Sequence, residues 1–424
     1  MDQRIKTKLE TQARHASMRC RVFEVKVEKA LLSKTRLEHL QRLFLEAKWF
    51  YNHCVQNIPT LETLDTKRKM VPVKTPNGVE DRPMFALSSQ MRQGMTQRLW
   101  TSLKALSTLK KKGERVGWIQ FKSHVDCIPL KQLGFTYDIV GKKKIRLQNL
   151  KGKLRVNGLD QIKERVEVAN ANLVRRHQDY YFRITTYEPK ESNPVPQEAI
   201  GIDLGCETQL TLSNGIKIQF AVPPTRRLKR LDRKIHKHKR EDSKNRRKDQ
   251  LKRQKEYHRI QDRRRDVQRK IATLLVKNFK TITIQDDSLK GWQASGHGRK
   301  ISWTGLGGIT EALHRKASTL SEVNRFFPST KTCSKCGNIR EKLEQWERVF
   351  ECPHCDLRMD RDVNAAINIL EQGKKEVAGK IPAGRGDFKP QERSAPSEGL
   401  LESLNAIPRV SAKLASLSGE AAPL

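Results

Sequence analysis

The sequence lacks long hydrophobic runs and any apolar segment of the kind that directs secretion. Its longest apolar stretches, such as IATLLV at 271–276, are far too short to span a bilayer. Residues 1–22 are rich in charged and polar side chains and have no apolar core of the kind that signal peptides carry. We therefore expect a cytoplasmic protein with no membrane partner.

The sequence is also short of acidic residues. Asp and Glu total 47 against 85 Lys and Arg, which gives a formal net charge of +38 over 424 residues. A surplus of this size repels itself unless a polyanion neutralises it. Nucleic acid is the usual polyanion, because each phosphate contact releases counterions; an anionic membrane surface is the competing partner. The length allows two or three domains, each with a core.

The eight cysteines divide into a scattered set and a cluster. We expect the scattered ones to be buried thiols: Cys20, Cys54, Cys127 and Cys206. The cluster consists of two C-x-x-C pairs, Cys333–Cys336 and Cys352–Cys355, with fifteen residues between them. Two such pairs supply four thiolates in a tetrahedron, which is typical of Zn²⁺. Four thiolates leave no open position, so the zinc would be structural; His354, inside the second pair, is a less favoured ligand.

The first 190 residues show strand and helix patterns in turn. A period of two over 18–29 predicts a strand, and apolar residues at spacings of three and four predict helices over 31–58 and 85–112. The second helix ends in a lysine run that either contacts phosphate or is a solvated helix end. Residues 118–187 are β-rich, and 188–198 form a proline-containing linker.

The remaining residues begin with an apolar strand, AIGIDLG at 199–205, followed by a hairpin that turns at Asn214-Gly215. The most basic stretch, 226–270, predicts two helices joined near 243–245, with a disordered basic tract as the alternative. In either form a phosphate backbone is its natural partner. The other predicted elements are strands at 281–287 and 322–327, and helices over 301–322 and from 360 to a stop near Gly373.

Two aspartate motifs could carry chemistry. Asp203 closes the AIGIDLG strand, where it could hold a divalent ion in a cleft or only cap a turn. In DRD at 360–362, Asp362 could bind metal beside Asp203 or cap the helix that follows. Asp360 is the alternate ligand, because positions two apart share a face in extended backbone. Two-metal phosphodiester hydrolysis needs carboxylates from separate segments.

These pieces together resemble TnpB, a family of transposon-encoded RNA-guided nucleases related to the type V CRISPR effectors. The specific matches are GIDLG at 201–205, PSTKTCSKCG at 328–337 and FECPHCDLRMDRDVNAAINIL at 350–370. The weaker matches are EAKWFYN at 46–52, FKSHVDCIPL at 121–130 and the basic stretch at 226–270. The resemblance covers most of residues 18–372.

The resemblance implies a multidomain α/β protein. It implies an RNase H-like domain of the RuvC type with a zinc ribbon, preceded by a β-barrel wedge domain that carries a helical recognition insert. The ranges that match are 1–30 and 118–190 for the wedge, 31–117 for the recognition domain, 196–330 and 359–372 for the RuvC-like domain with its basic hairpin at 226–270, and 331–358 for the ribbon. Residues 373–424, rich in Gly, Pro, Ser, Ala and Glu, are predicted to be a disordered tail.

The resemblance maps the family's first and last catalytic aspartates to Asp203 and Asp362. The middle position departs from the family, because Gln285 stands in TITIQDDSLKGW where a glutamate is usual. A neutral amide cannot replace an anionic ligand. Since positions two apart on a strand share a face, Asp287 is predicted to supply the carboxylate. Glu322 is the second substitute, and the last alternative is that neither one works.

Three functions follow. The favoured one is an RNA-guided DNA endonuclease: a noncoding guide RNA from the same locus pairs with one strand of the target double-stranded DNA, and Asp203, Asp287 and Asp362 bind Mg²⁺ or Mn²⁺. The second is a nuclease-deficient guided DNA-binding protein or repressor, which Gln285 motivates. The third is a structural, ribosomal-type RNA-binding protein with a zinc ribbon. The first two imply a prokaryotic cytoplasmic protein that joins the nucleoid when bound; the oligomeric state has no signal in the sequence.

Overall fold

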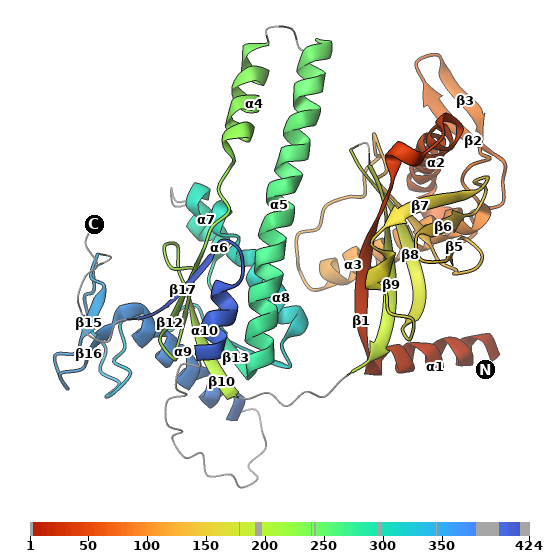
Figure 1. The fold of residues 1–424 in the computed structure, drawn as a ribbon. Helices are drawn as coiled ribbons and strands as arrows, with labels where there is room; N and C mark the ends of the chain where they lie inside the picture. Colours follow the sequence, from red (N-terminus) through yellow and green to blue (C-terminus); the bar gives the residue numbers. More distant parts are fainter. Residues whose placement is uncertain are drawn as a thin grey trace. The chain divides into compact units, whose positions relative to one another are not determined.

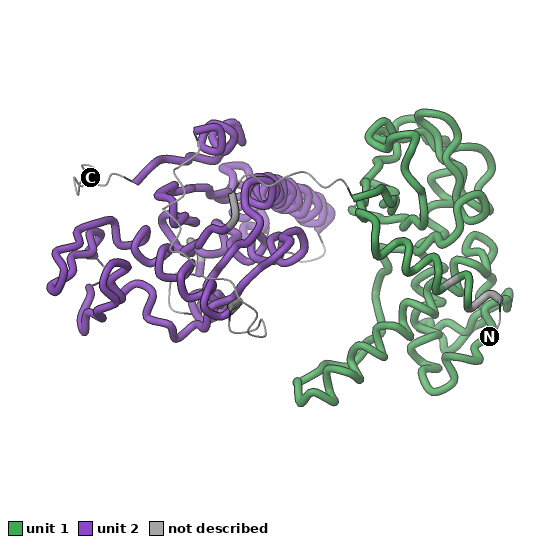
Figure 2. The backbone as a smooth tube through the Cα atoms, turned by 90° about the horizontal axis from the view of Figure 1, so that it is seen from below, with its two compact units in different colours: residues 1–192 green, residues 193–424 purple. Residues whose placement is uncertain are grey.

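The chain divides into two compact units, residues 1–192 and 193–424 (Figure 2). The computed structural model describes residues 3–177, 179–190, 197–238, 240, 243–294, 298–344, 346–378 and 398–415. The units have separate hydrophobic cores, and each is described by itself. Among the described residues, no helix combines the length and the apolar character that a membrane crossing requires.

The first unit is built on a seven-stranded sheet in the order β4-β8-β9-β1-β7-β6-β5 (Figure 1). The strands are β1 (Met18–Val27), β4 (Cys127–Leu130), β5 (Tyr137–Val140), β6 (Lys144–Leu147), β7 (Lys153–Asn157), β8 (Glu167–Arg176) and β9 (Asp179–Pro189). The predicted strand at 18–29 and the predicted β-rich segment 118–187 therefore join in one sheet. Buried and partly buried side chains alternate along β9, which gives the sheet a buried face.

Helices cover this sheet and supply the rest of its core. The elements are α1 (Gln3–Ser17), η1 (Lys29–Leu31), α2 (Lys34–Gln56), η2 (Ile58–Thr60), the hairpin β2 (Met70–Thr75) and β3 (Gly78–Pro83), α3 (Ser89–Lys111) and η3 (Leu159–Gln161). The side chains of Ser33 and Ser88 cap α2 and α3 by accepting backbone N–H groups. The predicted helices over 31–58 and 85–112 are confirmed as α2 and α3, whereas α1 and the β2–β3 hairpin were not predicted.

The second unit holds a six-stranded sheet in the order β14-β13-β10-β11-β12-β17. The strands are β10 (Gln197–Leu204), β11 (Leu210–Leu212), β12 (Ile216–Phe220), β13 (Phe279–Gln285), β14 (Thr319–Val323) and β17 (Val410–Leu414). Strands β10, β13 and β14 are parallel, and β10, β11, β12 and β17 pair antiparallel. The predicted hairpin at Asn214-Gly215 is confirmed as the β11–β12 connection.

The two faces of this sheet are covered by different helices. Ile200 and Ile202 of β10 and Ile282 and Ile284 of β13 belong to a core shared with helix residues. Those helices are α5 (Lys244–Asn278), α8 (Leu306–Lys316) and α10 (Glu398–Asn405). Side chains alternate across a strand, so residue 203 of β10 faces the opposite side, which α9 (Arg361–Ala378) covers.

Helix α9 lies directly on the strand backbones. A Cβ atom at Gly201 would stand 2.1 Å from the carbonyl oxygen of Ala366, and one at Gly373 would stand 2.3 Å from Thr283 Cγ2. Both positions therefore require glycine. The predicted stop of this helix at Gly373 is wrong: the helix continues to Ala378, and Gly373 serves close packing.

The basic stretch predicted as two helices is confirmed. Helices α4 (Arg226–Lys237) and α5 run side by side as a long hairpin (Figure 1). The remaining elements of the unit are α6 (Leu289–Trp292), α7 (Gly298–Thr304) and the two-stranded ribbon of β15 (Val349–Glu351) and β16 (Arg358–Asp360).

The predicted disordered tail is wrong where the structure describes it. Helix α10 packs Leu400 and Leu404 into the core of the second unit, and β17 pairs with β12 at the edge of the sheet. The rest of the tail, 379–397 and 416–424, lies outside the described residues, as does 191–196 of the predicted linker.

Two predicted element boundaries are also wrong. The predicted strand at 322–327 ends at Val323, and strand β14 instead occupies residues from Thr319, which had been given to a helix.

Candidate active site and metal centre

Parallel strands β10 and β13 end side by side and present polar side chains toward α9. Asp203 lies on the same face of β10 as Gly201, and Gln285 lies on the same face of β13 as Thr283. Both glycine and threonine positions contact α9. The carboxyl ends of parallel strands are where α/β proteins bind ligands, so this edge is a natural place for a site.

Asp362 reaches the same edge from the first turn of α9. The turn is fixed by Asp360, whose Oδ1 accepts hydrogen bonds from the backbone N–H groups of Asp362 and Val363, both at 3.1 Å. Asp360 is thus the helix cap, and Asp362 is free of that task. The capping role left open for Asp362 is therefore filled by Asp360.

Lys217 contacts the start of α9, and no local sequence pattern singles it out. Asp203 pairs with Thr211, and Thr211 pairs with Lys217, so a row across three strands carries Lys217 on the face of Asp203. Its Nζ lies 2.6 Å from Asp360 Oδ2 and 3.5 Å from Asp362 Oδ2. The lysine therefore ties the N-terminus of α9 to the sheet.

Asp287 completes a group of three carboxylates around one cavity. The cavity has a volume of about 550 Å³ and is lined by Asp203, Asp287 and Asp362 together with Gln285. Asp287 does not reach it for the predicted reason, because β13 ends at Gln285 and strand alternation stops there. A tight turn follows, in which the Asp287 N–H donates to the Gln285 carbonyl at 2.9 Å.

Asp203 lies in the negative field of the other two carboxylates. Burial raises the pKa of Asp203 well above its usual value, and the negative charges of Asp362 and Asp287 raise it further, against the opposing effects of Arg361 and Lys217. Burial, followed by the charge of Asp286, raises the pKa of Asp287 to about 6. The cavity therefore favours a bound positive charge, whether a proton or a metal ion.

Gln285 is committed to a structural task. Its Nε2 donates to the carbonyl oxygens of Asn324, Arg325 and Phe327, at 3.2, 3.3 and 2.8 Å, and its Oε1 accepts from Ser329 Oγ at 2.7 Å. The side chain is only 7% exposed. Three carbonyl oxygens require the NH₂ group, so an amide fits this position and a carboxylate does not.

Glu322, the other proposed substitute, does not line the cavity. Its Oε1 lies 3.1 Å from His314 Nε2, and its side chain is close to half exposed. Asp286, next to Asp287, is exposed and pairs with Arg325 at 2.5 Å. Of Asp286, Asp287 and Glu322, only Asp287 lines the cavity together with Asp203 and Asp362.

The four clustered cysteines form a metal-binding geometry. Their sulfur atoms all lie within 4.8 Å of one another, with 3.5 Å between Cys333 and Cys355 and 3.6 Å between Cys336 and Cys352. A tetrahedral zinc thiolate site has sulfur atoms about 3.8 Å apart, given Zn–S bonds of about 2.3 Å. The predicted cysteines are brought together, and the group could bind a metal ion. His354 is exposed and does not belong to it.

Two buried asparagines connect the first cysteine pair to α9. Asn364 accepts from the Ser334 N–H at 3.0 Å and donates to the Thr332 carbonyl at 2.7 Å. Asn368 donates to the carbonyl oxygens of Ser329 and Thr332, at 2.8 and 2.6 Å. The segment of the first cysteine pair is thus hydrogen-bonded to the helix whose first turn carries the Asp362 carboxylate.

Comparison with known proteins gives consistent matches. The family model described as "Probable transposase" matches residues 181–291, and the one described as "Cas12f1-like, TNB domain" matches 309–369. A protein of Streptomyces pristinaespiralis named "Putative RNA-guided DNA endonuclease" is 36% identical over 211 residues, which are 48% of this chain and 50% of that protein. This chain thus matches about half the length of that relative.

One more relative and one solved structure give matches of the same type. TnpB-like protein L79 of Acanthamoeba polyphaga mimivirus is 30% identical over 131 residues, covering 28% of this chain and 25% of that protein. Among solved structures, Cas12f1 in a complex with sgRNA and target DNA aligns with a TM-score of 0.50 and 16% identity, over 87% of this chain and 86% of that one. At this identity the likeness concerns the fold, which is Cas12-like.

We predict about one zinc ion per chain, bound by the four cysteines. Replacing Cys352 with Ser should abolish zinc binding, because three thiolates cannot close the tetrahedron. The same change at the exposed Cys20 is the matched control and should leave the zinc content unchanged. Elemental analysis of the purified variants measures this, and a zinc content near zero in the unaltered protein would refute the assignment.

Replacing Gln285 with Glu should destabilise the protein. The new carboxylate would face three carbonyl oxygens with one hydroxyl as its donor, at a cost of roughly 1–3 kcal/mol. Gln219 on β12 is exposed, so Gln219→Glu is the matched control. Urea unfolding measures both free energies, and equal values for the two variants would show that the amide is not needed.

In the absence of metal, Asp203→Asn should raise the melting temperature. The folded-state pKa of Asp203 lies above its unfolded value near 3.8, so its stabilising contribution is complete below pH 3.8 and is lost as the pH rises through the folded pKa. Asparagine removes that penalty at pH 7–8, and the gain should fade toward pH 4. Thermal melts with a chelator measure the difference, and a lower melting temperature for the variant at pH 8 would contradict it.

Proposed function

Because this chain is a TnpB-type protein, we propose that it is an RNA-guided DNA endonuclease. The observation that carries the proposal is the convergence of Asp203, Asp287 and Asp362 on one cavity of the second unit. These residues lie on three segments that are far apart in the sequence. A solvated surface or a purely structural domain has no need to hold three carboxylates against their mutual repulsion.

The three aspartates would hold Mg²⁺ or Mn²⁺. Carboxylate oxygens are the ligands that these hard cations prefer, and the raised pKa values of Asp203 and Asp287 express the same demand for positive charge. When bound, such ions activate water and stabilise the attacking and leaving oxygens of a phosphodiester. Lys217, through its contacts with both carboxylates at the start of α9, keeps Asp362 oriented toward the cavity.

Basic side chains of the same cavity would bring the substrate in. Lys331, Arg348 and Arg361 line it together with the three aspartates. Arg348 pairs with Glu207 at 2.6 Å, and Arg361 lies 3.5 Å from Asp362 Oδ1. Cations at these positions attract a phosphodiester backbone while the carboxylates take the metal ions. In this proposal the second unit is the RuvC-like nuclease domain, with its zinc ribbon beside the cavity.

The guide RNA and the target DNA would be held by charge. Helices α4 and α5 carry 21 basic and five acidic residues, a surplus of 16. Helix α5 has 35 residues and is therefore about 50 Å long. A basic hairpin of that length can follow the backbone of a nucleic-acid duplex. The solved complex of Cas12f1 with sgRNA and target DNA supports these two partners, and the proposed guide is a noncoding RNA from the same locus.

A nuclease-deficient guided DNA-binding protein is the second candidate. The observation that favours it is Gln285, whose amide is bound to the loop at 324–329 and offers no charge to a metal ion. This candidate predicts guide-dependent binding that is indifferent to changes in the three aspartates. It becomes the better account if the purified protein binds matched DNA with its guide but does not cut it.

Two neighbouring aspartates provide the matched test. The purified protein with its copurifying RNA is incubated with Mg²⁺ and DNA matched to that RNA. Asp287→Asn should slow cleavage by at least about 100-fold, because changes outside the metal's own ligands already cost about 10–100-fold. Asp286→Asn should cut normally, since Asp286 is exposed and pairs with Arg325.

The outcomes separate the two candidates. Guide-dependent binding, followed by gel shift, should be the same for both variants. Cleavage by the unaltered protein that persists in Asp287→Asn would refute the assigned carboxylate. No cleavage by any form, with binding intact, would favour the nuclease-deficient candidate.

A further inference from the structure

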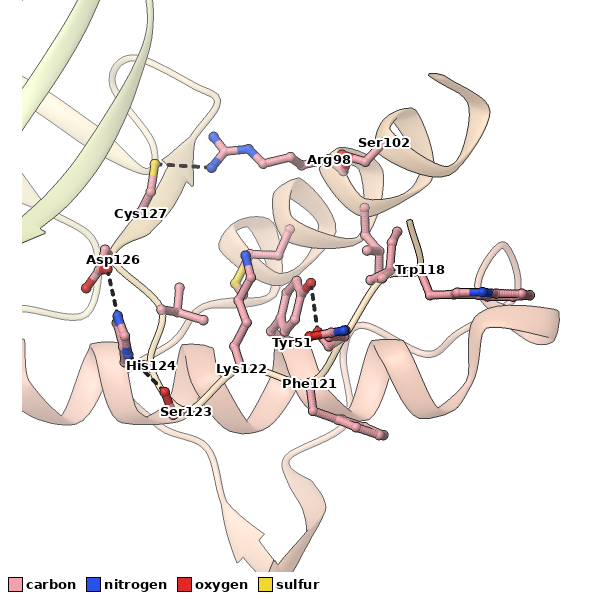
Figure 3. A pocket seen from close by; sticks show the side chains of 15 residues that line it. Tyr51, Arg98, Ser102, Trp118, Phe121, Lys122, Ser123, His124, Asp126 and Cys127 are labelled. Atoms are coloured by element: carbon pink, nitrogen blue, oxygen red, sulfur yellow. Dashed lines mark hydrogen bonds and ion pairs between the residues drawn. The ribbon is translucent and has the colours of Figure 1, made fainter. Parts of the chain in front are cut away.

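A second cavity lies entirely within the first unit. It has a volume of about 750 Å³ and is bordered by α2, α3 and the segment 118–127 (Figure 3). The segment has no regular secondary structure until β4 begins at Cys127. Nothing in the proposed cleavage chemistry uses this cavity.

The segment beside this cavity is held in place by α2. The side chain of Asn52 pairs with both backbone groups of Lys122: its Oδ1 accepts from the N–H at 2.8 Å, and its Nδ2 donates to the carbonyl at 3.0 Å. Ile119 and Val125 anchor the segment in the core of the unit. The backbone is therefore fixed in a defined position.

This fixed segment presents two aromatic side chains to solvent. Trp118 is 91% exposed and Phe121 is 65% exposed, and both line the cavity. In Figure 3 their rings extend away from the backbone of this segment. Leaving large rings in water forgoes the free energy that burial would provide. Exposed rings on an anchored backbone indicate a contact surface.

The surroundings of these rings are basic. Residues 104–122 contain six Lys or Arg and one acidic residue, Glu114. Lys122 Nζ lies 4.4 Å from the centre of the Tyr51 ring. Arg98 of α3 lines the cavity and donates to Cys127 Sγ and Asn172 Oδ1, neither of which is acidic. The cavity therefore joins planar apolar faces to positive charge.

We propose that this cavity binds an unpaired nucleotide of a nucleic-acid strand. The base would stack on Trp118 or Phe121, and the phosphates would lie against Arg98 and Lys122. Aromatic platforms beside a basic groove are how proteins hold single strands, because every base offers a π-face. A base inside a duplex has both faces covered by its neighbours, so an intact duplex cannot use the rings in this way. The strand can be RNA or DNA, and the site is independent of guided cleavage.

Photo-crosslinking locates such a contact directly. The full-length protein is mixed with a single strand containing 5-iodouridine or 5-iododeoxyuridine and irradiated, in separate RNA and DNA arms. Trypsin cuts after Arg115 and Lys122, which releases VGWIQFK with both aromatic residues. The proposal expects a nucleotide adduct on this peptide in at least one arm, and the arm identifies the strand. Adducts in other peptides alone, in both arms, would overturn it.

Affinity measurements provide the matched control. Phe135 is also an exposed aromatic of the first unit, at 67%, but it does not line the cavity. At a salt concentration that weakens phosphate contacts, Trp118→Ala or Phe121→Ala should reduce single-strand affinity by roughly 5- to 100-fold. Phe135→Ala should change it less than twofold, and Trp118→Tyr should keep most of it.

Two results would contradict the proposed stacking site. Equal affinities for Trp118→Ala, Phe121→Ala and Phe135→Ala, measured by fluorescence anisotropy, would reject the stacking site. The site would also be rejected if Trp118→Ala and Phe121→Ala reduced the affinity for a duplex of the same sequence as much as they reduced the affinity for the single strand. Neither readout involves metal or cleavage, so a failure here is distinct from a failure of the nuclease proposal.

Discussion

Helix α9 lies so close to the sheet that residue 201 has no room for a side chain. A similarly close contact occurs at Gly373, five residues before the end of the helix at Ala378, where any Cβ would meet Thr283. Because these glycines let the helix touch the strands, its first turn lies at the carboxyl end of β10, and Asp362 faces the cavity that Asp203 lines. The cavity is lined by segments that are far apart in the sequence, and the contact between α9 and the strands holds Asp362 at its edge. Buried Asn364 extends it to the cysteine cluster, so α9 carries Asp362 and is also hydrogen-bonded to the segment of the first cysteine pair.

Gln285 has a structural role at the end of β13. Its amide holds the loop that leads from β14 into the first cysteine pair, and a carboxylate there would face three carbonyl oxygens. The acidic group stands two residues later, after the strand has ended and turned. That turn, rather than strand alternation, brings Asp287 to the cavity that Asp203 lines. Asp287 thus reaches the cavity from a turn that follows the strand, and not from the strand itself.

Regular patterns in the sequence predicted most of the fold. The period of two at 18–29, the apolar stripe of α2 and the Asn214-Gly215 turn all depend on neighbouring residues, and all are confirmed. Helix α1 was missed because Ile5 and Leu9 are the only large apolar residues among its fifteen positions. Strand β17 was missed because its segment is poor in large apolar residues and gains its order from pairing with β12. The spacing of the cysteines encoded their cluster, whereas Lys217 had no local signal, since its role arises from pairing across three strands.

The central claim is that three carboxylates together hold divalent cations. A crystal of the protein grown with Mn²⁺ tests it most directly, because manganese scatters anomalously and its position can be read without any assumption about the chemistry. The account predicts anomalous density between the carboxylates of Asp203, Asp287 and Asp362, at two positions about 3.5–4 Å apart if both ions bind. Density at other acidic clusters, with none in the cavity at millimolar Mn²⁺ and a pH above 7, would contradict it.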